Sequence, residues 1–169
     1  RGYQQVRQCE HPHCVVCGRN CDSGLGLEFR CLDEGRVQAN FACHRLLEGY
    51  PCILHGGVVS AVLDGAMTNC LFAAGKAAVT GDLRVRVRKP VSTQGTATVQ
   101  AWIESSTPPL YRVAAHLKQE GEIKATARAK FMEIPAQLGG QKIPSCHSKS
   151  TNPLPLGTDI ETKNERSHC

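Results

Sequence analysis

The stretch HGGVVSAVLDGAM, residues 55–67, decides the fold of this 169-residue chain. Apolar residues recur at helical spacing over residues 58–74, and Gly75 is well placed to end the helix. The predicted helix is apolar nearly all round, so we expect it to lie inside the protein rather than on an open surface. It nevertheless opens on a histidine and two glycines and carries a carboxylate at Asp64.

Segments on both sides of this helix alternate between apolar and polar residues, as half-buried strands do. Before the helix, LGLEFRCL and RVQANFACH form a predicted hairpin around Asp33-Glu34-Gly35, and Glu48-Gly49-Tyr50-Pro51 is a predicted loop. After it come AVTGDLRVRVRKPV, GTATVQAWIES, LYRVAAHLKQ and IKATARAKFMEI. This order predicts an α+β domain with a largely antiparallel sheet. Because the helix is so apolar, we expect the sheet to wrap around it, which is the geometry of the hotdog fold.

The chain divides into three parts by composition. Residues 1–22 are polar and rich in cysteine and histidine, residues 23–135 carry the predicted hotdog domain, and residues 136–169 are rich in Pro, Ser, Thr, Asn and Gly. The last composition is typical of disorder.

Charge and cysteine usage indicate a class of partner and a compartment. The formal net charge is +5 without a long basic block, which suits an anionic small molecule and gives no reason to expect nucleic acid. We see no apolar run long enough to span a bilayer, so we expect no membrane partner. Several of the ten cysteines lie inside apolar segments, which favours a reducing, cytoplasmic location.

The start of the predicted helix has the chemistry of an oxyanion hole. The first amides of a helix lack partners within it and carry partial positive charge, and Gly56 and Gly57 leave them open to a ligand. Asp64 lies about 10 Å further along the axis than Gly57. One thioester carbonyl cannot contact both, so a site that used both would take them from two subunits related by a two-fold axis.

Structural roles also account for these residues. His55 suits a helix cap, the glycines suit tight packing, and Asp64 suits a solvated position. The apolar neighbours of Asp64 instead favour its partial burial, and a partly buried carboxylate can serve as nucleophile or general base.

The stretch HGGVVSAVLDGAM, preceded by GYPCIL and followed by AVTGDLRVRVRKPV, resembles the acyl-CoA thioesterases of the PaaI-like hotdog superfamily. The resemblance covers residues 14–132 and includes CVVCGRNCDSGLGLEF ahead of the first strand. It implies a homodimer, or a dimer of dimers, that hydrolyses an acyl-CoA thioester to free acid and CoA. No cofactor and no metal are expected.

The resemblance also implies roles for single residues. Gly57 would offer its amide to the thioester carbonyl, His55 would set the helix start, and Asp64 of the facing subunit would act as base or nucleophile. Thr80 matches a residue that positions the attacking water. Some members carry an asparagine or glutamine shortly before HGG, where the nearest polar side chain here is Glu48. This departure keeps open a non-catalytic acyl-CoA-binding or sensor protein.

Basic residues after the helix are candidates for binding the phosphates of CoA. Arg84, Arg86 and Arg88 alternate with apolar residues, so they share one face of a strand, and Lys89 follows them. A solvated or intersubunit face with salt bridges is the alternative. A hotdog hydratase or dehydratase ranks lower, because His55 and Asp64 would lie at opposite ends of two helical turns.

A cluster near the N-terminus has the pattern H-x-H-C-x-x-C-x-x-x-C, formed by His11, His13, Cys14, Cys17 and Cys21. The C-x-x-C spacing lets two thiolates reach one tetrahedral zinc ion. Zinc modules usually pair two separated half-sites, however, and the chain has one compact cluster. We therefore predict a loop that packs without metal, with zinc and a redox dithiol as the alternatives.

Overall fold

The computed structural model describes residues 2–134, so the predicted disordered tail, residues 136–169, lies outside the described residues. The elements in chain order are α1 (Tyr3–Glu10), β1 (Arg30–Cys31), β2 (Val37–Ala42), β3 (Glu48–Tyr50), β4 (Ile53–Leu54), α2 (Gly56–Ala73), β5 (Ala78–Val87), β6 (Thr96–Thr107), β7 (Leu110–Gln119) and β8 (Glu122–Glu133). Short 3₁₀ turns occupy Asp33–Gly35 and Arg45–Leu47.

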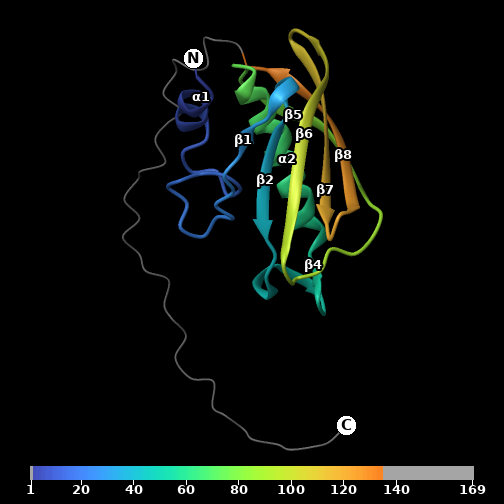
Figure 1. The fold of residues 1–169 in the computed structure, drawn as a ribbon. Helices are drawn as coiled ribbons and strands as arrows, with labels where there is room; N and C mark the ends of the chain where they lie inside the picture. The colour runs from blue at the N-terminus through green and yellow to red at the C-terminus, as the bar shows by residue number, and fades with distance from the viewer. Residues whose placement is uncertain (1, 135–169) are drawn as a thin grey trace, which may run out of the picture.

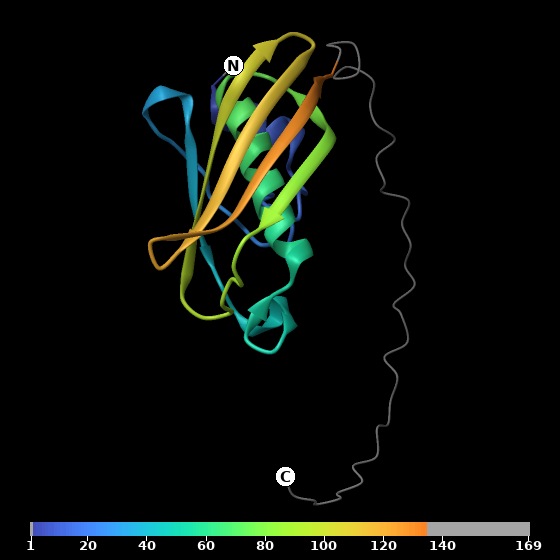
Figure 2. The ribbon, with the colours of Figure 1, turned by 90° about the vertical axis from the view of Figure 1, so that its right-hand side faces the viewer.

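Six strands form one antiparallel sheet in the order β1-β2-β6-β7-β8-β5, and β3 and β4 form a separate pair. Helix α2 lies along one face of the six-stranded sheet, where it contacts β2, β5, β6, β7 and β8 (Figures 1 and 2). The predicted hotdog architecture is therefore confirmed.

Small side chains on the sheet let α2 approach closely. Alternate positions of β6, β7 and β8 point at the helix and are buried, among them Ala97, Ala101, Ala115, Ala125, Ala127 and Ala129. The helix fills the space with larger apolar residues, including Leu63, Met67 and Leu71, which are fully buried. Burial of each such side chain contributes roughly 1.5–3 kcal/mol.

The burial of α2 also explains its composition. The helix has 18 residues and a mean hydropathy of 1.3, which by length and composition alone would suffice for a membrane span. The sequence predicts no apolar run long enough to span a bilayer, and α2 does not meet that expectation. Burial explains the apolar character of α2, because 61% of its residues lie inside the protein.

Three predictions about the segments before α2 need correction. The first strand of the predicted hairpin is only β1, because the amides of Leu25 and Leu27 donate to the carbonyls of Val15 and Val16 instead of pairing with β2. The predicted loop after residue 47 contains β3, which pairs with β4. The N-terminal segment, for which the sequence predicts no helix or strand, begins with α1, which packs on α2.

The two edges of the large sheet differ. The edge strand β1 has two residues, whereas β5 has ten and pairs only with β8 among the described residues. Three apolar side chains of β5 are exposed, Val79 by 55%, Leu83 by 37% and Val87 by 50%. A long edge strand with exposed apolar residues is a template for pairing with another strand.

Candidate active site

The start of α2 is capped by its own histidine. The His55 Nδ1 atom accepts a hydrogen bond from the Gly57 amide at 2.9 Å, and the His55 carbonyl accepts from the amides of Val58 and Val59. The sequence predicted an open Gly57 amide, but the imidazole occupies it in the free chain. The Gly56 amide has no acceptor within residues 2–134. Both glycines and His55 are exposed, so a ligand can reach this end of the helix.

Asp64 and Thr80 come together from α2 and β5. The Thr80 Oγ1 hydroxyl donates a hydrogen bond to Asp64 Oδ1 at 2.8 Å. The predicted partial burial of Asp64 is confirmed, and this burial raises the pKa of the carboxyl above its ordinary value of 3.8. The hydrogen bond from Thr80 acts in the opposite direction and lowers that pKa.

A β-bulge in β5 sets which residues face α2. Thr80 pairs with Phe131, whereas Asp82 pairs with the next residue of β8, Lys130, so Gly81 is the extra residue. Phe131 is fully buried on the helix side and Lys130 is exposed on the other face. Thr80 therefore faces the helix and Asp64, while Asp82 lies on the outer face.

The same bulge places the basic side chains away from Asp64. Arg84 and Arg86 follow the phase of Asp82 and lie on the outer face of the sheet. Arg84 pairs with Asp82 at 3.6 Å, and Lys89, beyond the end of β5, pairs with Glu122. Within residues 2–134, Arg86 and Arg88 have no salt-bridge partner.

Within one chain, the predicted site therefore forms two separate groups. His55 with Gly57 lies at the start of α2, and Asp64 with Thr80 lies two turns further on. Gly57 and Asp64 are seven residues apart, so they share one face of the helix. That face is only partly covered, since Ala61 between them and Asp64 itself are half-buried.

Glu48 does not occupy the role of the amide side chain that some related proteins carry before HGG. Its Oε2 atom accepts a hydrogen bond from the Cys52 amide at 2.8 Å. Cys52 has a φ of 61°, so the carboxylate holds a tight turn between β3 and β4. The Glu48 side chain is therefore hydrogen-bonded to the backbone of its own loop.

Sequence reasoning missed that the N-terminal segment lies beside Asp64. Cys14 raises and His11 lowers the pKa of the Asp64 carboxyl, less strongly than burial and Thr80 do. Gly65, next to Asp64, marks the contact, because a Cβ atom there would lie 2.5 Å from Val16 Cγ1. A glycine inside an otherwise strong helical pattern was the available signal of this close approach.

Comparisons with known proteins support the hotdog fold and the resemblance of the chain to thioesterases. No family model matches the chain. Over 76 residues the chain is 34% identical to the acyl-coenzyme A thioesterase THEM4 of Bos taurus, an alignment that covers 43% of this chain and 31% of that protein. The matched region thus spans about a third of the length of that relative.

Solved structures share the fold over most of the chain. The PaaI protein of E. coli, from the phenylacetic acid degradation operon, matches with a TM-score of 0.65 and 18% identity, over 76% of this chain and 95% of that one. The smu.793 protein of Streptococcus mutans, bound to acetyl CoA, matches with a TM-score of 0.60 and 16% identity, over 64% and 88%. The predicted resemblance to PaaI-like hotdog proteins is confirmed at the level of the fold.

Proposed function

We propose that this hotdog protein hydrolyses acyl-CoA thioesters to the free acid and CoA, in a site shared by two copies of the chain. The observation that carries the proposal is the Asp64–Thr80 pair, a partly buried carboxylate hydrogen-bonded to a hydroxyl at 2.8 Å on the same helix face as Gly57. The thioesterase name of the bovine relative and the acetyl CoA bound to the streptococcal structure support this class of substrate.

The chemistry requires an ionised Asp64 and an anion-binding helix start. Asp64 attacks the thioester carbonyl or takes the proton of a water that Thr80 holds, and both courses need the carboxylate form. Negative charge then develops on the carbonyl oxygen, where amides at a helix start stabilise it. Gly56 offers a free amide, and Gly57 offers a second one when the substrate oxygen replaces the exposed His55 ring.

Two chains are needed because one helix cannot bring both groups to one carbonyl. Gly57 and Asp64 are separated by about 10 Å along the axis of α2. If two β5 edges pair antiparallel about a two-fold axis, the sheets join and the two α2 helices run antiparallel side by side. The start of each helix then faces the middle of the other.

Leu83→Lys tests this arrangement, because it places a charge in the β5 edge. The variant is expected to be a monomer in light scattering and to lose activity.

The outer-face arginines suit the phosphates of CoA rather than the acyl group. Arg86 lies on the outer face and Arg88 directly follows β5. Neither has a salt-bridge partner within residues 2–134, and guanidinium groups match phosphate oxygens well. Arg86 lies on the opposite face of the sheet from Thr80 and Asp64, so it is separate from the groups proposed to act on the acyl carbonyl.

Release of CoA thiol from a panel of acyl-CoAs tests the activity directly. The wild-type chain is expected to turn over at least one short, long or aromatic thioester, and Asp64→Asn is expected to bind it without turnover. If the wild type binds acyl-CoA but releases CoA from none of the thioesters, hydrolysis is rejected in favour of an acyl-CoA sensor.

A hydratase is the less favoured alternative, because His55 Nδ1 faces Gly57 instead of Asp64.

Complementation tests whether the site is shared. A chain with Asp64→Asn and a chain with Gly57→Pro are each inactive by this proposal, but a mixed dimer holds one intact site. After unfolding and refolding together in equal amounts, about a quarter of the wild-type activity per chain is expected, because half of the dimers are mixed and each has one of two sites intact. Activity no higher than the sum of the two variants would exclude a shared site.

A further inference from the structure

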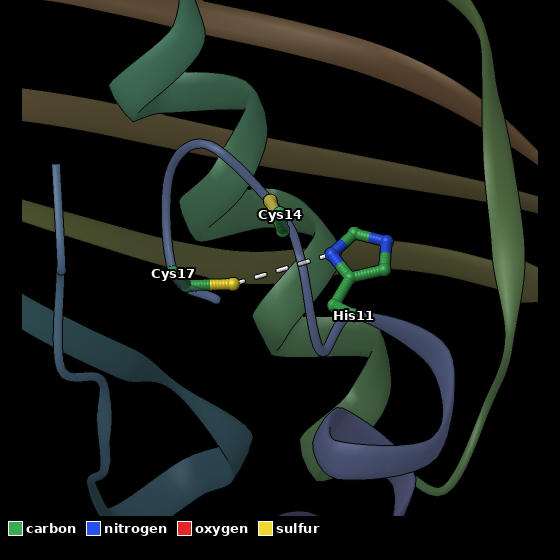
Figure 3. Close-up of side chains that lie close together, drawn as sticks. All are labelled: His11, Cys14 and Cys17. Atoms are coloured by element: carbon green, nitrogen blue, oxygen red, sulfur yellow. Dashed lines mark hydrogen bonds between the residues drawn. The ribbon is translucent and has the colours of Figure 1, made fainter. Parts of the chain in front are cut away.

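Three potential metal ligands gather in the loop after α1. The side-chain donor atoms of His11, Cys14 and Cys17 all lie within 4.8 Å of one another (Figure 3). Cys17 is buried, and His11 and Cys14 are half-buried. The active-site proposal uses none of them, so the cluster needs its own explanation.

The distances are close to those of a tetrahedral zinc site. With bonds of about 2.3 Å to sulfur and 2.0–2.1 Å to nitrogen, a tetrahedral ion holds its ligand atoms roughly 3.5–3.8 Å apart. Cys17 Sγ and His11 Nδ1 lie 4.0 Å apart. Binding of one ion would draw the three donor atoms slightly closer together, and two sulfurs with an imidazole are ligands that favour zinc.

Two amide groups beside the cluster donate hydrogen bonds to its sulfurs. The backbone amide of Val16 donates to Cys14 Sγ at 3.4 Å, and the Asn69 Nδ2 amide donates to Cys17 Sγ at 3.4 Å. Asn69 is itself fully buried in α2 and is fixed by the Tyr3 hydroxyl at 2.9 Å. Such outer contacts orient the ligands of metal sites and stabilise thiolates.

We propose that His11, Cys14 and Cys17 bind one zinc ion, with water in the fourth position. The two other members of the sequence cluster do not join them. His13 Nδ1 lies 3.1 Å from the Asn20 carbonyl oxygen, and Cys21 is absent from the group of converging donor atoms. The sequence argument against zinc relied on the missing second half-site, but three protein ligands and one water complete a tetrahedron.

The proposed ion would fasten the N-terminal segment to the core helix. The His11 ring packs edge-on against Phe72 of α2, with 4.9 Å between ring centroids, and Cys17 contacts Asn69 of the same helix. The segment covers α2 beside Asp64 and Gly65. Zinc at this point would therefore hold the segment against α2, and added zinc is expected to raise the melting temperature of the metal-free chain.

Metal analysis of the full chain, expressed without a histidine tag and kept reduced, is the direct test. We expect about one zinc per chain, or uptake of one equivalent after chelation. Cys14→Ser, Cys17→Ser and His11→Asn are each expected to abolish this binding, whereas Cys9→Ser and Cys21→Ser retain it. The double variant Cys146→Ser, Cys169→Ser is also expected to retain it. No zinc uptake by the wild type, or unchanged uptake by Cys14→Ser or Cys17→Ser, would overturn the proposal.

Alkylation of the wild type keeps the test independent of whether the variants fold. Zinc is expected to protect Cys14 and Cys17 from a thiol reagent, with no effect on the exposed Cys9, Cys31 and Cys52. Equal labelling with and without zinc would contradict the site. A Cys14–Cys17 peptide that stays lighter by two hydrogens in the metal-free chain despite the reductant would show a disulfide and overturn the proposal.

Discussion

The start and the middle of α2 both carry polar groups, but the protein treats them differently. At the start, His55, Gly56 and Gly57 are exposed, and the Gly57 amide is satisfied by a side chain that can rotate away. In the middle, Asp64 is half-buried and is held by Thr80 from another element. The helix start is thus open to a ligand, whereas the carboxylate in the middle is fixed by a neighbouring strand. This difference is what the proposal of two complementary half-sites would require.

Asp64→Asn should have the largest effect on activity, because the amide cannot act as base or nucleophile. We expect kcat to fall by roughly 10²–10⁴-fold. The variant should still fold, since an amide oxygen can accept the Thr80 hydrogen bond. Thiol release and circular dichroism check the two statements, and activity within a few-fold of the wild type would remove Asp64 from the mechanism.

The same variant should be more stable than the wild type at neutral pH. Burial raises the pKa of Asp64 in the folded chain, so its ionised form carries a cost there that asparagine does not. The advantage should shrink as pH falls through the raised pKa and vanish below about 3.8, the ordinary value. Urea unfolding across this range is the measurement, and a constant difference at every pH would contradict the assignment.

Gly57→Pro should come next, because it removes the amide proposed to hold the oxyanion. In the free chain this amide binds only the His55 ring, so no backbone hydrogen bond of the helix is lost. Loss of one such donor typically costs about 10²–10³-fold in kcat. Gly57→Ala is the matched control, since it keeps the amide, although its Cβ atom would lie 3.0 Å from His55 Nδ1. Equal losses in both variants would indicate a steric effect only.

Thr80→Val should have a smaller effect with a distinct pH signature. Loss of a hydrogen bond of about 1–1.5 kcal/mol corresponds to roughly a tenfold fall in kcat/KM. Because this bond lowers the pKa of Asp64, its removal should move the acid limb of the kcat/KM profile to higher pH. Thr80→Ser should restore the wild-type profile. An unshifted acid limb would separate Thr80 from the titration of Asp64.

Charge removal on the outer face should have the smallest effect. The double variant Arg86→Gln, Arg88→Gln is expected to raise KM for acyl-CoA about three- to tenfold, an effect that salt should reduce by screening. Arg84→Gln is the control, because Arg84 already pairs with Asp82. A thioester of pantetheine, which lacks the nucleotide, should show no change in KM. The same increase with pantetheine would exclude phosphate recognition.

The main elements of this fold could be predicted from local sequence alone. The period of the apolar residues located α2 and the strands from β5 to β8, and the apolar surface all round the helix indicated that the sheet covers it. The errors fell where pairing is non-local. Leu25 and Leu27 alternate as a strand would, but their amides bind the carbonyls of Val15 and Val16. No local pattern specifies that choice of partner.

In the candidate site, too, local sequence predicted the residues but not the contacts that depend on the three-dimensional structure. The motif identified Asp64, Thr80 and the helix start, and the structure brings Asp64 and Thr80 into contact. The capping of Gly57 by His55 depends on a side-chain rotamer, and the outer position of Arg84 and Arg86 depends on a bulge that period-two reasoning does not detect. The gathering of His11, Cys14 and Cys17 required the loop conformation, which residue spacing left open.

The extra residue in β5 has a consequence for how such a protein can change over evolutionary time. Because Gly81 shifts the phase of the strand, Thr80 lies on the helix side of the sheet while Arg84 and Arg86 lie on the opposite face. If the proposed roles hold, substitutions at the outer positions would alter recognition of the anionic carrier without disturbing the carboxylate–hydroxyl pair. One inserted residue would thus let the two faces of a single strand change independently of each other.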